Sequence, residues 1–450
     1  MKVLVCVKVS NGEINPFDES ALEWALRISD DVTVLSMGPE STKEVLKPLT
    51  RLGAKVTLLS DSRFAGSDTL ATAYILSVAA KKLGYDLILC GKQSIDGDTA
   101  QVGPMLSEFL KCNLITNALD VAVNEEYVKC NTRLAKEDAK LPALVTLERS
   151  AVLRFPSIFS MVCEVDVLDN VYLKCDISRS GLSGSPTRVI QSFTYEKGKR
   201  KCKFISKNEL KPLVDKLLKE RSHREVNVEE KAKLSSVWAV GEEVFEKASE
   251  IADEVIPIEK TDAETIAERA KKENPSVILW NADSWGRKTA PRVAAMLNTG
   301  LCADCTELEA DGGNLIMYRP AKGGSIYAKI KCLKNPQMAT VRTKQESGEV
   351  IVSVGKGASE SLDKAERLAK ELGAEMCASR GLVDMGRADY ARQVGLTGKT
   401  VSPRIYIAIG ISGAVQHTCA IEGVDTVIAI NPDKDARIFE YADYGILEEF

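Results

Sequence analysis

The feature that most constrains the fold is a regular alternation of short apolar runs and helical stretches over the first 110 residues. We expect strands at Lys2–Val9, Val32–Ser36, Lys55–Leu59 and Asp86–Cys90, and helices at Glu19–Ile28, Ser41–Leu52, Asp68–Leu83 and Thr99–Leu110. Strands separated by helices of this length predict βαβ units and a parallel sheet that is covered on both faces. Sheets of this kind bind ligands beyond the carboxyl ends of their strands.

An internal repeat extends this pattern to the rest of the chain. The segment LILCGKQSIDGDTAQVGPMLSEFL (Leu87–Leu110) is similar to VILWNADSWGRKTAPRVAAMLNTGL (Val277–Leu301). Each has an apolar strand, a polar loop and then a helix. A third unit with the same alternation begins near Ile351 and contains IVSVGKG, AEMCASRG, IYIAIGISGAVQH and DTVIAIN. The predicted fold class is therefore α/β, with several Rossmann- or flavodoxin-like parallel-sheet domains, two of them related by the repeat.

Changes in composition suggest where the domains end. The stretch SRSGLSGSPTR is rich in glycine and serine, and YEKGKRKCKF and KERSHREVNVEEKAK are highly charged. Such a stretch is typical of a linker or an extended arm. We predict a first domain at residues 1–177, a linker or arm at 178–235, a domain that contains the repeat at 236–346 and a C-terminal domain at 347–450.

Bulk composition excludes several classes of function. The net charge of −4 gives no reason to expect nucleic acid as a partner. No apolar run reaches the roughly 18 residues of a membrane span, and the N-terminus lacks the pattern of a signal peptide. The twelve cysteines are scattered and mostly sit in apolar runs, which favours a reducing compartment, the cytoplasm. Cys302 and Cys305 form a lone C-x-x-C pair, and with only two histidines in the chain we expect no metal site.

The turn AIGISGAVQH carries the first sign of ligand chemistry. Gly410 and Gly413 permit a sharp turn and the close approach of a ligand to the backbone. Ser412 is a candidate N-cap for a following helix, whose free amides would favour an anion. His417 would lie at the start of that helix. Alone, this motif is also compatible with tight packing.

Two further turns should lie at the same edge of the sheet. In CASRG, Arg380 supplies a planar guanidinium for phosphate or for a delocalised anion. In QVGLTGKT, the loop between Gly395 and Gly398 supplies backbone donors and the Thr397 hydroxyl. Together with His417, these turns favour a nucleotide-like cofactor.

These motifs also carry a resemblance to a known family. Part of the chain resembles the flavin domain of the electron-transfer flavoprotein α subunit. The segments that carry this resemblance, in the same order as in the family, are SRGLVDMG, QVGLTGKTVSP, YIAIGISGAVQH, VIAIN and ADYGI. The N-terminal half resembles the β subunit, in the segments NPFDESALEWAL, SMGPE, FAGSDTLATAY and GKQSIDGDTAQVGP. The chain thus looks like a fused β–α electron-transfer flavoprotein with a truncated α-like first domain.

The resemblance implies FAD in the C-terminal domain. It places Arg380 near the flavin ring, Thr397 near N5 and His417 at the flavin O2. Lys356 stands where an arginine is usual. The positions that match the family's FAD contacts are Lys356, Ser379, Arg380, Gln393, Val394, Gly395, Thr397, Gly410, Ser412, Gly413, Ala414, Gln416, His417, Asn431 and Asp443.

A second nucleotide is implied for the β-like domain. Family members hold AMP there or, in the bifurcating subgroup, a second FAD. FAGSDTLATAY, DGDTAQVGP and NPQMATVR look more like the bifurcating subgroup. The candidate residues are Asn15, Gly38, Asp68, Thr69, Gly91, Gln93, Asp96, Gly97, Asp98, Thr99 and Gln101.

The resemblance also implies a partner. VLRFPSIFSM is similar to the loop that docks on an acyl-CoA dehydrogenase, with Phe155 at the anchor position. The leading hypothesis is an electron carrier between such a flavoprotein dehydrogenase and an acceptor. One alternative is an electron-bifurcating protein that oxidises NADH and works with ferredoxin and an enoyl-CoA reductase. Of the three hypotheses, only this one gives the chain an enzymatic activity of its own. The other alternative is a redox-silent nucleotide-binding regulatory module.

Overall fold

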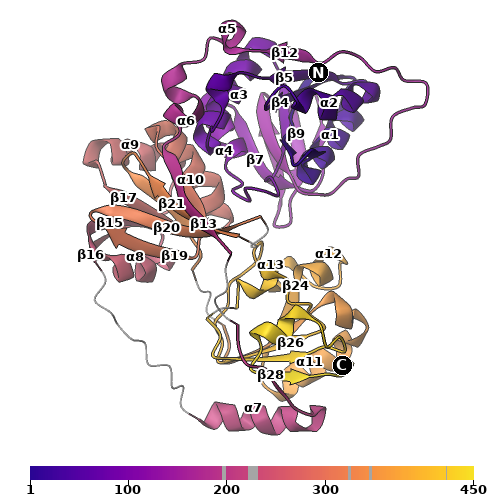
Figure 1. Ribbon diagram of the computed structural model, residues 1–450, viewed down its shortest axis with the longest axis vertical. Helices are drawn as coiled ribbons and strands as arrows, with labels where there is room; N and C mark the ends of the chain where they lie inside the picture. The colour runs from indigo at the N-terminus through magenta and orange to yellow at the C-terminus, as the bar shows by residue number, and fades with distance from the viewer. Residues whose placement is uncertain (195–198, 221–231, 323–325, 344–346, 422) are drawn as a thin grey trace. The chain divides into compact units, whose positions relative to one another are not determined.

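The computed structural model describes residues 1–194, 199–220, 232–322, 326–343, 347–421 and 423–450 (Figure 1). The chain divides into two compact units. Unit 1 contains the described residues of 1–192, 231–322 and 328–341, and unit 2 those of 193–230, 323–327 and 342–450. No described helix has both the length and the hydropathy that a membrane span requires.

The first sheet of unit 1 has seven strands, all parallel. Their order is β12 (Asp166–Leu168), β5 (Lys55–Leu59), β4 (Asp31–Met37), β1 (Lys2–Cys6), β6 (Leu87–Gly91), β11 (Ala143–Leu147) and β7 (Asn113–Ala118). Helix α1 (Pro16–Ile28) packs with one hydrophobic cluster, and α3 (Thr69–Leu83) and α4 (Val102–Leu110) pack with another. The alternation in the sequence correctly predicted this covered, parallel sheet.

The second sheet of unit 1 confirms the internal repeat. Its five parallel strands are β16 (Ala252–Ile258), β15 (Leu234–Val240), β17 (Val277–Asn281), β22 (Gln337–Val341) and β18 (Leu301–Cys305). The order β15-β17-β22-β18 reproduces β1-β6-β11-β7 of the first sheet. Its helices are α8 (Phe245–Ile251), α9 (Ala263–Glu273) and α10 (Ser284–Leu297). Helices α3, α4, α9 and α10 contribute to one shared core.

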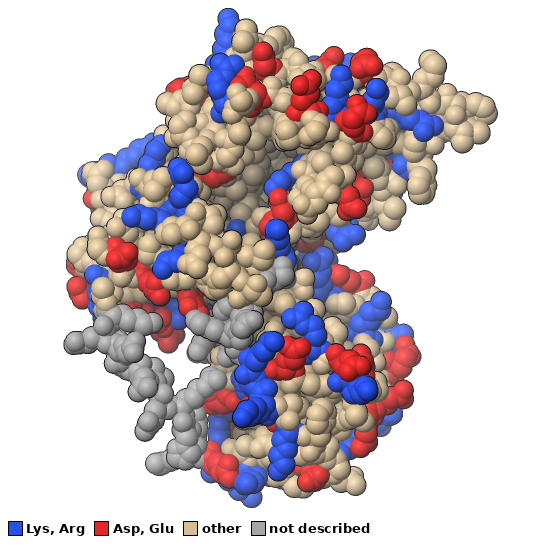
Figure 2. Space-filling view, viewed as in Figure 1, with Lys and Arg blue, Asp and Glu red and all other residues tan. Residues whose placement is uncertain are grey.

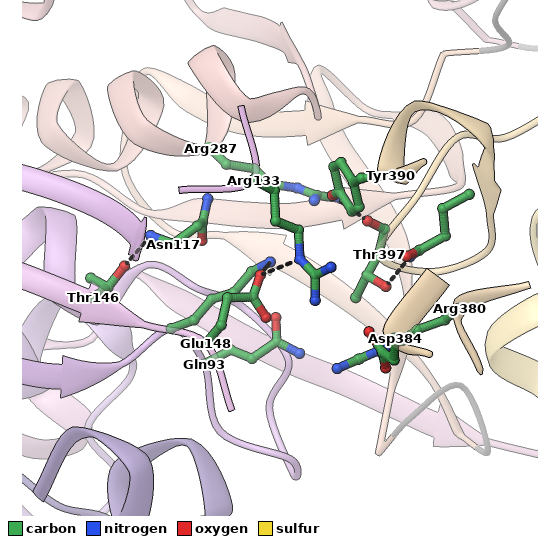
Figure 3. Close-up of polar contacts among 12 residues, drawn as sticks. Gln93, Asn117, Arg133, Thr146, Glu148, Arg287, Arg380, Asp384, Tyr390 and Thr397 are labelled. Atoms are coloured by element: carbon green, nitrogen blue, oxygen red, sulfur yellow. Dashed lines mark hydrogen bonds and ion pairs between the residues drawn. The ribbon is translucent and has the colours of Figure 1, made fainter. Parts of the chain in front are cut away.

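The two halves share a detail that the sequence comparison did not reveal. In the first half, the Asn117 backbone N–H donates to the Thr146 hydroxyl at 3.0 Å (Figure 3). In the second half, the Asp304 N–H donates to the Thr340 hydroxyl at 2.9 Å. Asn117 and Asp304 both have positive φ, and the ladder is irregular at both places. The repeat therefore includes a matching strand irregularity.

Smaller elements complete this part of the chain. One four-stranded sheet has the order β13 (Thr187–Phe193), β21 (Ile326–Cys332), β20 (Asn314–Ala321) and β19 (Glu307–Asp311). A three-stranded sheet has the order β10 (Lys136–Lys140), β9 (Tyr127–Asn131) and β8 (Ala122–Val123). A two-stranded hairpin pairs β2 (Val9–Ser10) with β3 (Glu13–Ile14). Three short helices are α2 (Thr42–Leu46), α5 (Asn170–Leu173) and α6 (Gly181–Gly184).

Unit 2 is built on a third parallel sheet. Its order is β14 (Lys203–Phe204), β28 (Tyr444–Ile446), β27 (Thr426–Ile430), β26 (Ile405–Ile409), β23 (Val350–Val354), β24 (Glu375–Ser379) and β25 (Gln393–Val394). The helices are α7 (Leu210–Lys219), α11 (Leu362–Glu371), α12 (Arg380–Asp384) and α13 (Val415–Thr418). The strands β23 to β28 form the C-terminal domain that the sequence predicted.

The stretch predicted as a linker or arm contains ordered elements of unit 2. Strand β14 adds the edge strand of the sheet, and α7 buries Leu210 and Val214 in the core of this unit. Arg200 donates to the carbonyls of Val424 and Asp425 at 2.6 and 3.0 Å. The sequence analysis did not predict these elements, because lysines are so frequent in this stretch that it resembles a linker. The apolar residues of α7 nevertheless recur at helical spacing between the lysines. Most of KERSHREVNVEEKAK, including His223, lies outside the described residues.

Candidate functional site

The sheet of unit 2 reverses its strand order between two neighbouring strands. The chain runs outward from β23 to β24 and β25 on one side, and from β26 to β27 and β28 on the other. The loops that follow β23 and β26 begin at Gly355 and Gly410. In open parallel sheets, the crevice at such a reversal is the usual ligand site. The sequence-predicted turns CASRG and QVGLTGKT follow β24 and β25 at the same edge.

The two glycines after β26 are required by the chain itself. Gly410 and Gly413 have φ of 62° and 81°. A Cβ at Gly410 would lie 2.5 Å from the Ala358 backbone nitrogen, and one at Gly413 would lie 2.1 Å from that of Ile438. The sequence interpretation of a sharp turn is confirmed, and the close neighbour is backbone of the same unit.

The capping role predicted for Ser412 is wrong. Helix α13 begins at Val415, and its N-cap is Ala414, which has no side chain that can cap. The positive φ of Gly413 delays the start of the helix, so Ser412 lies two residues before the cap. The Ser412 carbonyl instead accepts a hydrogen bond from the Ile438 N–H at 3.1 Å.

His417 is buried, with 6% of its surface exposed. Its Nε2 lies 2.8 Å from the Tyr406 hydroxyl oxygen. Its Nδ1 is buried and has no hydrogen-bond partner among the described residues. Burial lowers the pKa of the imidazole to about 4, although the Val394 backbone lies close enough to the ring to favour its protonated form and so oppose the shift. The ring is therefore neutral at pH 7.

The loop after β25 packs against α13. The Gln393 side-chain amide donates to the Thr397 hydroxyl at 2.7 Å, and the Tyr390 hydroxyl donates to the Thr397 carbonyl at 2.7 Å (Figure 3). The Leu396 N–H donates to the Gln416 carbonyl at 2.6 Å. These bonds fix the Thr397 side chain beside the residues that precede His417.

Charged groups follow the two strands on the other side of the reversal. Ser379 is the N-cap of α12, and Arg380 is its first residue. The Arg380 Nε lies 3.2 Å from a carboxylate oxygen of Asp384, and the pair is partly exposed (Figure 3). Lys356 follows β23, and a Cβ at Gly381 would lie 3.4 Å from the Lys356 Cβ. Lys356 and Arg380 therefore bring two cations to this edge.

Two predicted contacts are engaged elsewhere. The Asn431 amide donates to the Ile411 carbonyl at 3.0 Å and its oxygen accepts from the Asp433 N–H at 2.9 Å. The Asp443 carboxylate accepts from the Val427 N–H at 2.8 Å and pairs with Arg200. Because Val427 lies near the start of a parallel strand, Asp443 lies at the opposite, amino edge of the sheet. The structure does not bring Asp443 together with the other predicted residues.

The groups at the carboxyl edge suit a flavin. An orphaned, buried imidazole nitrogen needs a partner, because an unpaired buried polar group costs about 1–3 kcal/mol. A flavin offers the carbonyl oxygen O2 as an acceptor. The Thr397 hydroxyl and the Arg380 and Lys356 cations add polar groups that an anionic or phosphate-bearing cofactor can use.

A second candidate site lies within unit 1. A cavity of about 430 Å³ opens at the carboxyl ends of β1, β4 and β6. This volume is in the usual range for small-molecule sites. The sequence-predicted residues that line it are Asn15, Asp68, Thr69, Gly91, Gln93, Gly97, Thr99 and Gln101. Asp96, Asp98 and Gly38 do not line the cavity; Asp96 pairs with Lys8 at 2.7 Å, and Asp98 accepts from Gln93 at 3.0 Å.

Polar contacts hold the walls of this cavity. Asp68 caps α3 and accepts from the Thr187 hydroxyl at 2.6 Å, and the Thr69 hydroxyl donates to Gln101 at 2.8 Å. The Oδ1 of Asn15 and the Nε of Arg319 are buried without a partner among the described residues. Two orphaned polar atoms on lining residues fit a site made for a polar ligand.

The helix beyond this cavity starts later than predicted. Helix α4 begins at Val102 and not at Thr99. Asp98 and Ala100 have φ of 51° and 53°, which no right-handed helix permits. The Thr99 backbone is therefore part of the loop.

Sequence reasoning missed many of the lining residues, among them Lys8, Asp18 and Arg319. Lys8 and Asp18 lie close to the predicted turns, but only the fold brings them together. Burial raises the pKa of Asp18 to about 6, although N–H donors of Lys8 and Gly91 oppose the shift. Arg319 comes from β20, more than 200 residues away, and no local signal in the sequence marks it.

The predicted docking segment is an exposed apolar loop. Phe155, Ile158, Phe159 and Met161 are 95, 84, 88 and 84% exposed. The loop projects at the upper right of Figure 1, and the same region of Figure 2 is mostly uncharged surface. Isolated exposed apolar residues are common, but a contiguous group of this kind marks an interaction surface.

Polar contacts hold the backbone of this loop. Glu23 accepts hydrogen bonds from the Arg154 N–H, Nε and Nη2 at 3.1, 2.9 and 3.0 Å. Arg51 donates to the carbonyls of Ser157 and Ser160 at 3.0 and 3.2 Å. Burial alone would raise the pKa of Glu23, but hydrogen bonds from Arg154 and Arg27 outweigh it and bring the pKa to about 2. The apolar side chains are thus displayed on a fixed backbone.

The C-x-x-C pair is part of the core. Cys302 and Cys305 are buried in β18, and the Cys305 thiol donates to the Cys302 carbonyl at 3.8 Å. Burial raises the pKa of Cys305 well above its usual value. Within the part of the chain that the structure describes, no three histidine, cysteine or acidic side chains are grouped as metal ligands.

Comparison with known proteins assigns these domains. The profile of the electron transfer flavoprotein domain matches residues 3–153 and 238–367, and that of the electron transfer flavoprotein FAD-binding domain matches 345–422. The electron transfer flavoprotein subunit alpha of Thermoanaerobacterium thermosaccharolyticum is 40% identical over 232 residues, which cover 41% of this chain and 70% of the relative. The subunit beta of Megasphaera elsdenii is 42% identical over 202 residues (40% and 75%), and Protein FixB of Clostridium saccharobutylicum is 40% identical over 236 residues (42% and 71%). The chain therefore belongs to the electron transfer flavoprotein family, and its C-terminal domain is the family's FAD-binding domain.

Proposed function

We propose that this chain carries electrons through one FAD in unit 2, from a flavoprotein dehydrogenase of the acyl-CoA dehydrogenase type to an acceptor. The observation that carries the proposal is the orphaned, neutral imidazole of His417 at the strand reversal of the FAD-binding domain. Bound FAD supplies the redox chemistry, since no protein side chain in this site is an electron carrier.

The side chains around the proposed flavin position act as donors and cations. His417 Nδ1 would donate to the flavin O2, where reduction places negative charge. Thr397, held by Gln393 and Tyr390, presents its hydroxyl near N5. Arg380 would lie near the ring, and Lys356 would keep the charge of the usual arginine without its planar fork. These groups stabilise a reduced, anionic ring more than an oxidised, neutral one.

The apolar loop is the proposed docking surface for the dehydrogenase. Phe155 is the most exposed of the large apolar side chains of this loop, and aromatic anchors of this kind dominate the binding energy of interfaces. The contacts of Glu23 and Arg51 fix the loop before binding, so that little conformational entropy is lost when it docks.

The cavity of unit 1 is the proposed site of a second nucleotide, either AMP or FAD. Its lining includes the apolar side chains of Cys6, Leu35 and Leu76, and it also includes Asn15 and Arg319, whose Oδ1 and Nε have no partner among the described residues. This combination suits a flat heterocycle with polar substituents. A second FAD would favour the bifurcating alternative, with NADH, ferredoxin and an enoyl-CoA reductase as partners.

Counting the bound cofactors tests these proposals. The purified chain is denatured, and the released nucleotides are separated and quantified against protein. One FAD and one AMP per chain support simple electron transfer. Two FADs, with reduction by NADH, support bifurcation. A colourless protein that binds only a nucleotide would overturn the carrier function and leave the regulatory-module alternative.

A further inference from the structure

We propose that Tyr406 is a positioning residue for the flavin. The Tyr406 phenol donates a hydrogen bond to His417 Nε2 and so keeps the imidazole proton on Nδ1. The proposal rests on the proposed function, in which Nδ1 is the atom left for the cofactor. Tyr406 contacts the imidazole and the core, including the Ser353 side chain, and it acts through His417.

The geometry holds both partners rigidly. Tyr406 lies on β26 with none of its surface exposed, and the sharp turn at Gly410 and Gly413 brings His417 of α13 back over it. The phenol oxygen and Nε2 are 2.8 Å apart, and the two rings are 6.0 Å apart between centroids and inclined at 54°. The contact is therefore a hydrogen bond between the edges of the two rings.

Both groups are neutral at pH 7. Burial raises the pKa of the Tyr406 phenol well above its usual value, so the hydroxyl keeps its proton. Burial lowers the pKa of His417 to about 4, so the imidazole carries one proton. A protonated phenol and a neutral imidazole share one hydrogen bond, and its direction decides which ring nitrogen holds the imidazole proton.

Only one direction suits the unpaired nitrogen. If Tyr406 donates to Nε2, the imidazole proton sits on Nδ1, where it can be donated to a carbonyl oxygen such as the flavin O2. If Nε2–H donated to the phenol, Nδ1 would present a lone pair that no described group satisfies. That lone pair would also repel the charge that develops on O2. The hydrogen bond from Tyr406 thus prepares His417 as a donor.

The position of the proton can be measured because the chain has only two histidines. The full chain is labelled with ¹⁵N-histidine, and the tautomer of each ring is read from ¹⁵N shifts and long-range ¹H–¹⁵N couplings. His417→Gln assigns the signals. The expected wild-type result is the Nδ1–H tautomer for His417. Wild-type protein with the proton on Nε2 would overturn the proposal.

Tyr406→Phe removes the donor and keeps the ring volume. The expected result is a His417 population that moves away from the pure Nδ1–H form, with a lower potential for the first electron added to bound FAD. Tyr444→Phe, a loss of hydroxyl on β28 of the same sheet, should leave both unchanged. An unchanged tautomer and potential in Tyr406→Phe would overturn the positioning role.

A double variant separates positioning from general structural damage. In a His417→Gln background, Tyr406→Phe should cause no further fall in the flavin potential, because its effect passes through the imidazole. An additional fall of the same size as in the wild type would contradict the proposal. The tautomer can be read whether or not flavin is bound, so a chain without flavin would refute the proposed function and still test the Tyr406–His417 bond.

Discussion

The phenol oxygen of Tyr406 and Nε2 of His417 lie 2.8 Å apart inside the FAD-binding domain, and the other imidazole nitrogen has no partner among the described residues. This pair links a buried core strand to the edge of the sheet where the cofactor is proposed to bind. By burial alone Tyr406 would be assigned to core packing, but its hydrogen bond to His417 gives it the proposed positioning role.

Replacing His417 by alanine should lower the potential for the first electron added to the flavin. The variant lacks the donor to O2, and a hydrogen bond to a charged group contributes about 1.5–3 kcal/mol. A redox titration of bound FAD measures the change. Thr418→Ser, which alters the next residue of α13 and keeps its hydroxyl, is the control and should match the wild type. Equal potentials for His417→Ala and Thr418→Ser would contradict the role of His417.

His417 should also make folding stability depend on pH. Its pKa is about 4 in the folded chain and about 6.5 in an unfolded one, so between these values the unfolded chain binds more protons. The free energy of unfolding of unit 2 should therefore rise with pH from 4 to 6.5, by up to about 3 kcal/mol, and this contribution should be lost on acidification. His417→Gln should lack the dependence. Urea denaturation of both proteins across this range tests it, and parallel curves would show that the imidazole is not buried as described.

Replacing Phe155 by alanine should weaken docking on the dehydrogenase and leave the flavin unaffected. Loss of a large aromatic anchor costs roughly 2 kcal/mol or more, which corresponds to a rise of at least about tenfold in KM for the partner. Leu134→Ala is a matched control, because Leu134 is an apolar residue of unit 1 that is 70% exposed outside the loop. A Phe155→Ala protein that accepts electrons at the wild-type KM would rule out this anchor.

Replacing Glu23 by glutamine should loosen the docking loop. The uncharged amide cannot accept all the hydrogen bonds that Arg154 and Arg27 now donate. Amide hydrogen exchange in residues 151–163 should accelerate, and the KM for the partner should rise with kcat unchanged. Glu164→Gln breaks the exposed contact with Lys43 at the far end of the loop and should have little effect. Similar exchange in both variants would show that Glu23 does not fix the loop.

Much of the fold was predictable because its signals are local. Apolar runs between amphipathic helices predicted the parallel sheets, and the segments at Leu87–Leu110 and Val277–Leu301 predicted two related halves. Helix α7 was missed because its apolar residues are embedded among lysines, and packing on the sheet of unit 2 decides its fate. The helical spacing of these apolar residues was present in the sequence, but the surrounding charge made the stretch look like a linker.

The candidate sites were less predictable because they depend on backbone geometry and on distant residues. Ser412 has the side chain of a cap, but the left-handed Gly413 delays the helix. Thr99 stands in the loop because its neighbours Asp98 and Ala100 adopt positive φ. Arg319 reaches the cavity from a strand of the other half of the repeat. No pattern in the sequence pointed to the bond between Tyr406 and His417.

Electron delivery to the flavin of this chain can be measured directly. The purified protein is mixed without oxygen with an acyl-CoA dehydrogenase that has been reduced by its substrate, and the absorbance of bound FAD is followed by stopped flow. We expect rapid bleaching of one FAD per chain. Phe155→Ala should slow the bleaching when the partner is limiting, and Leu134→Ala should leave its rate unchanged. A chain that binds FAD but whose flavin stays oxidised, or that loses no rate in Phe155→Ala, would contradict the proposed electron transfer through the docking loop.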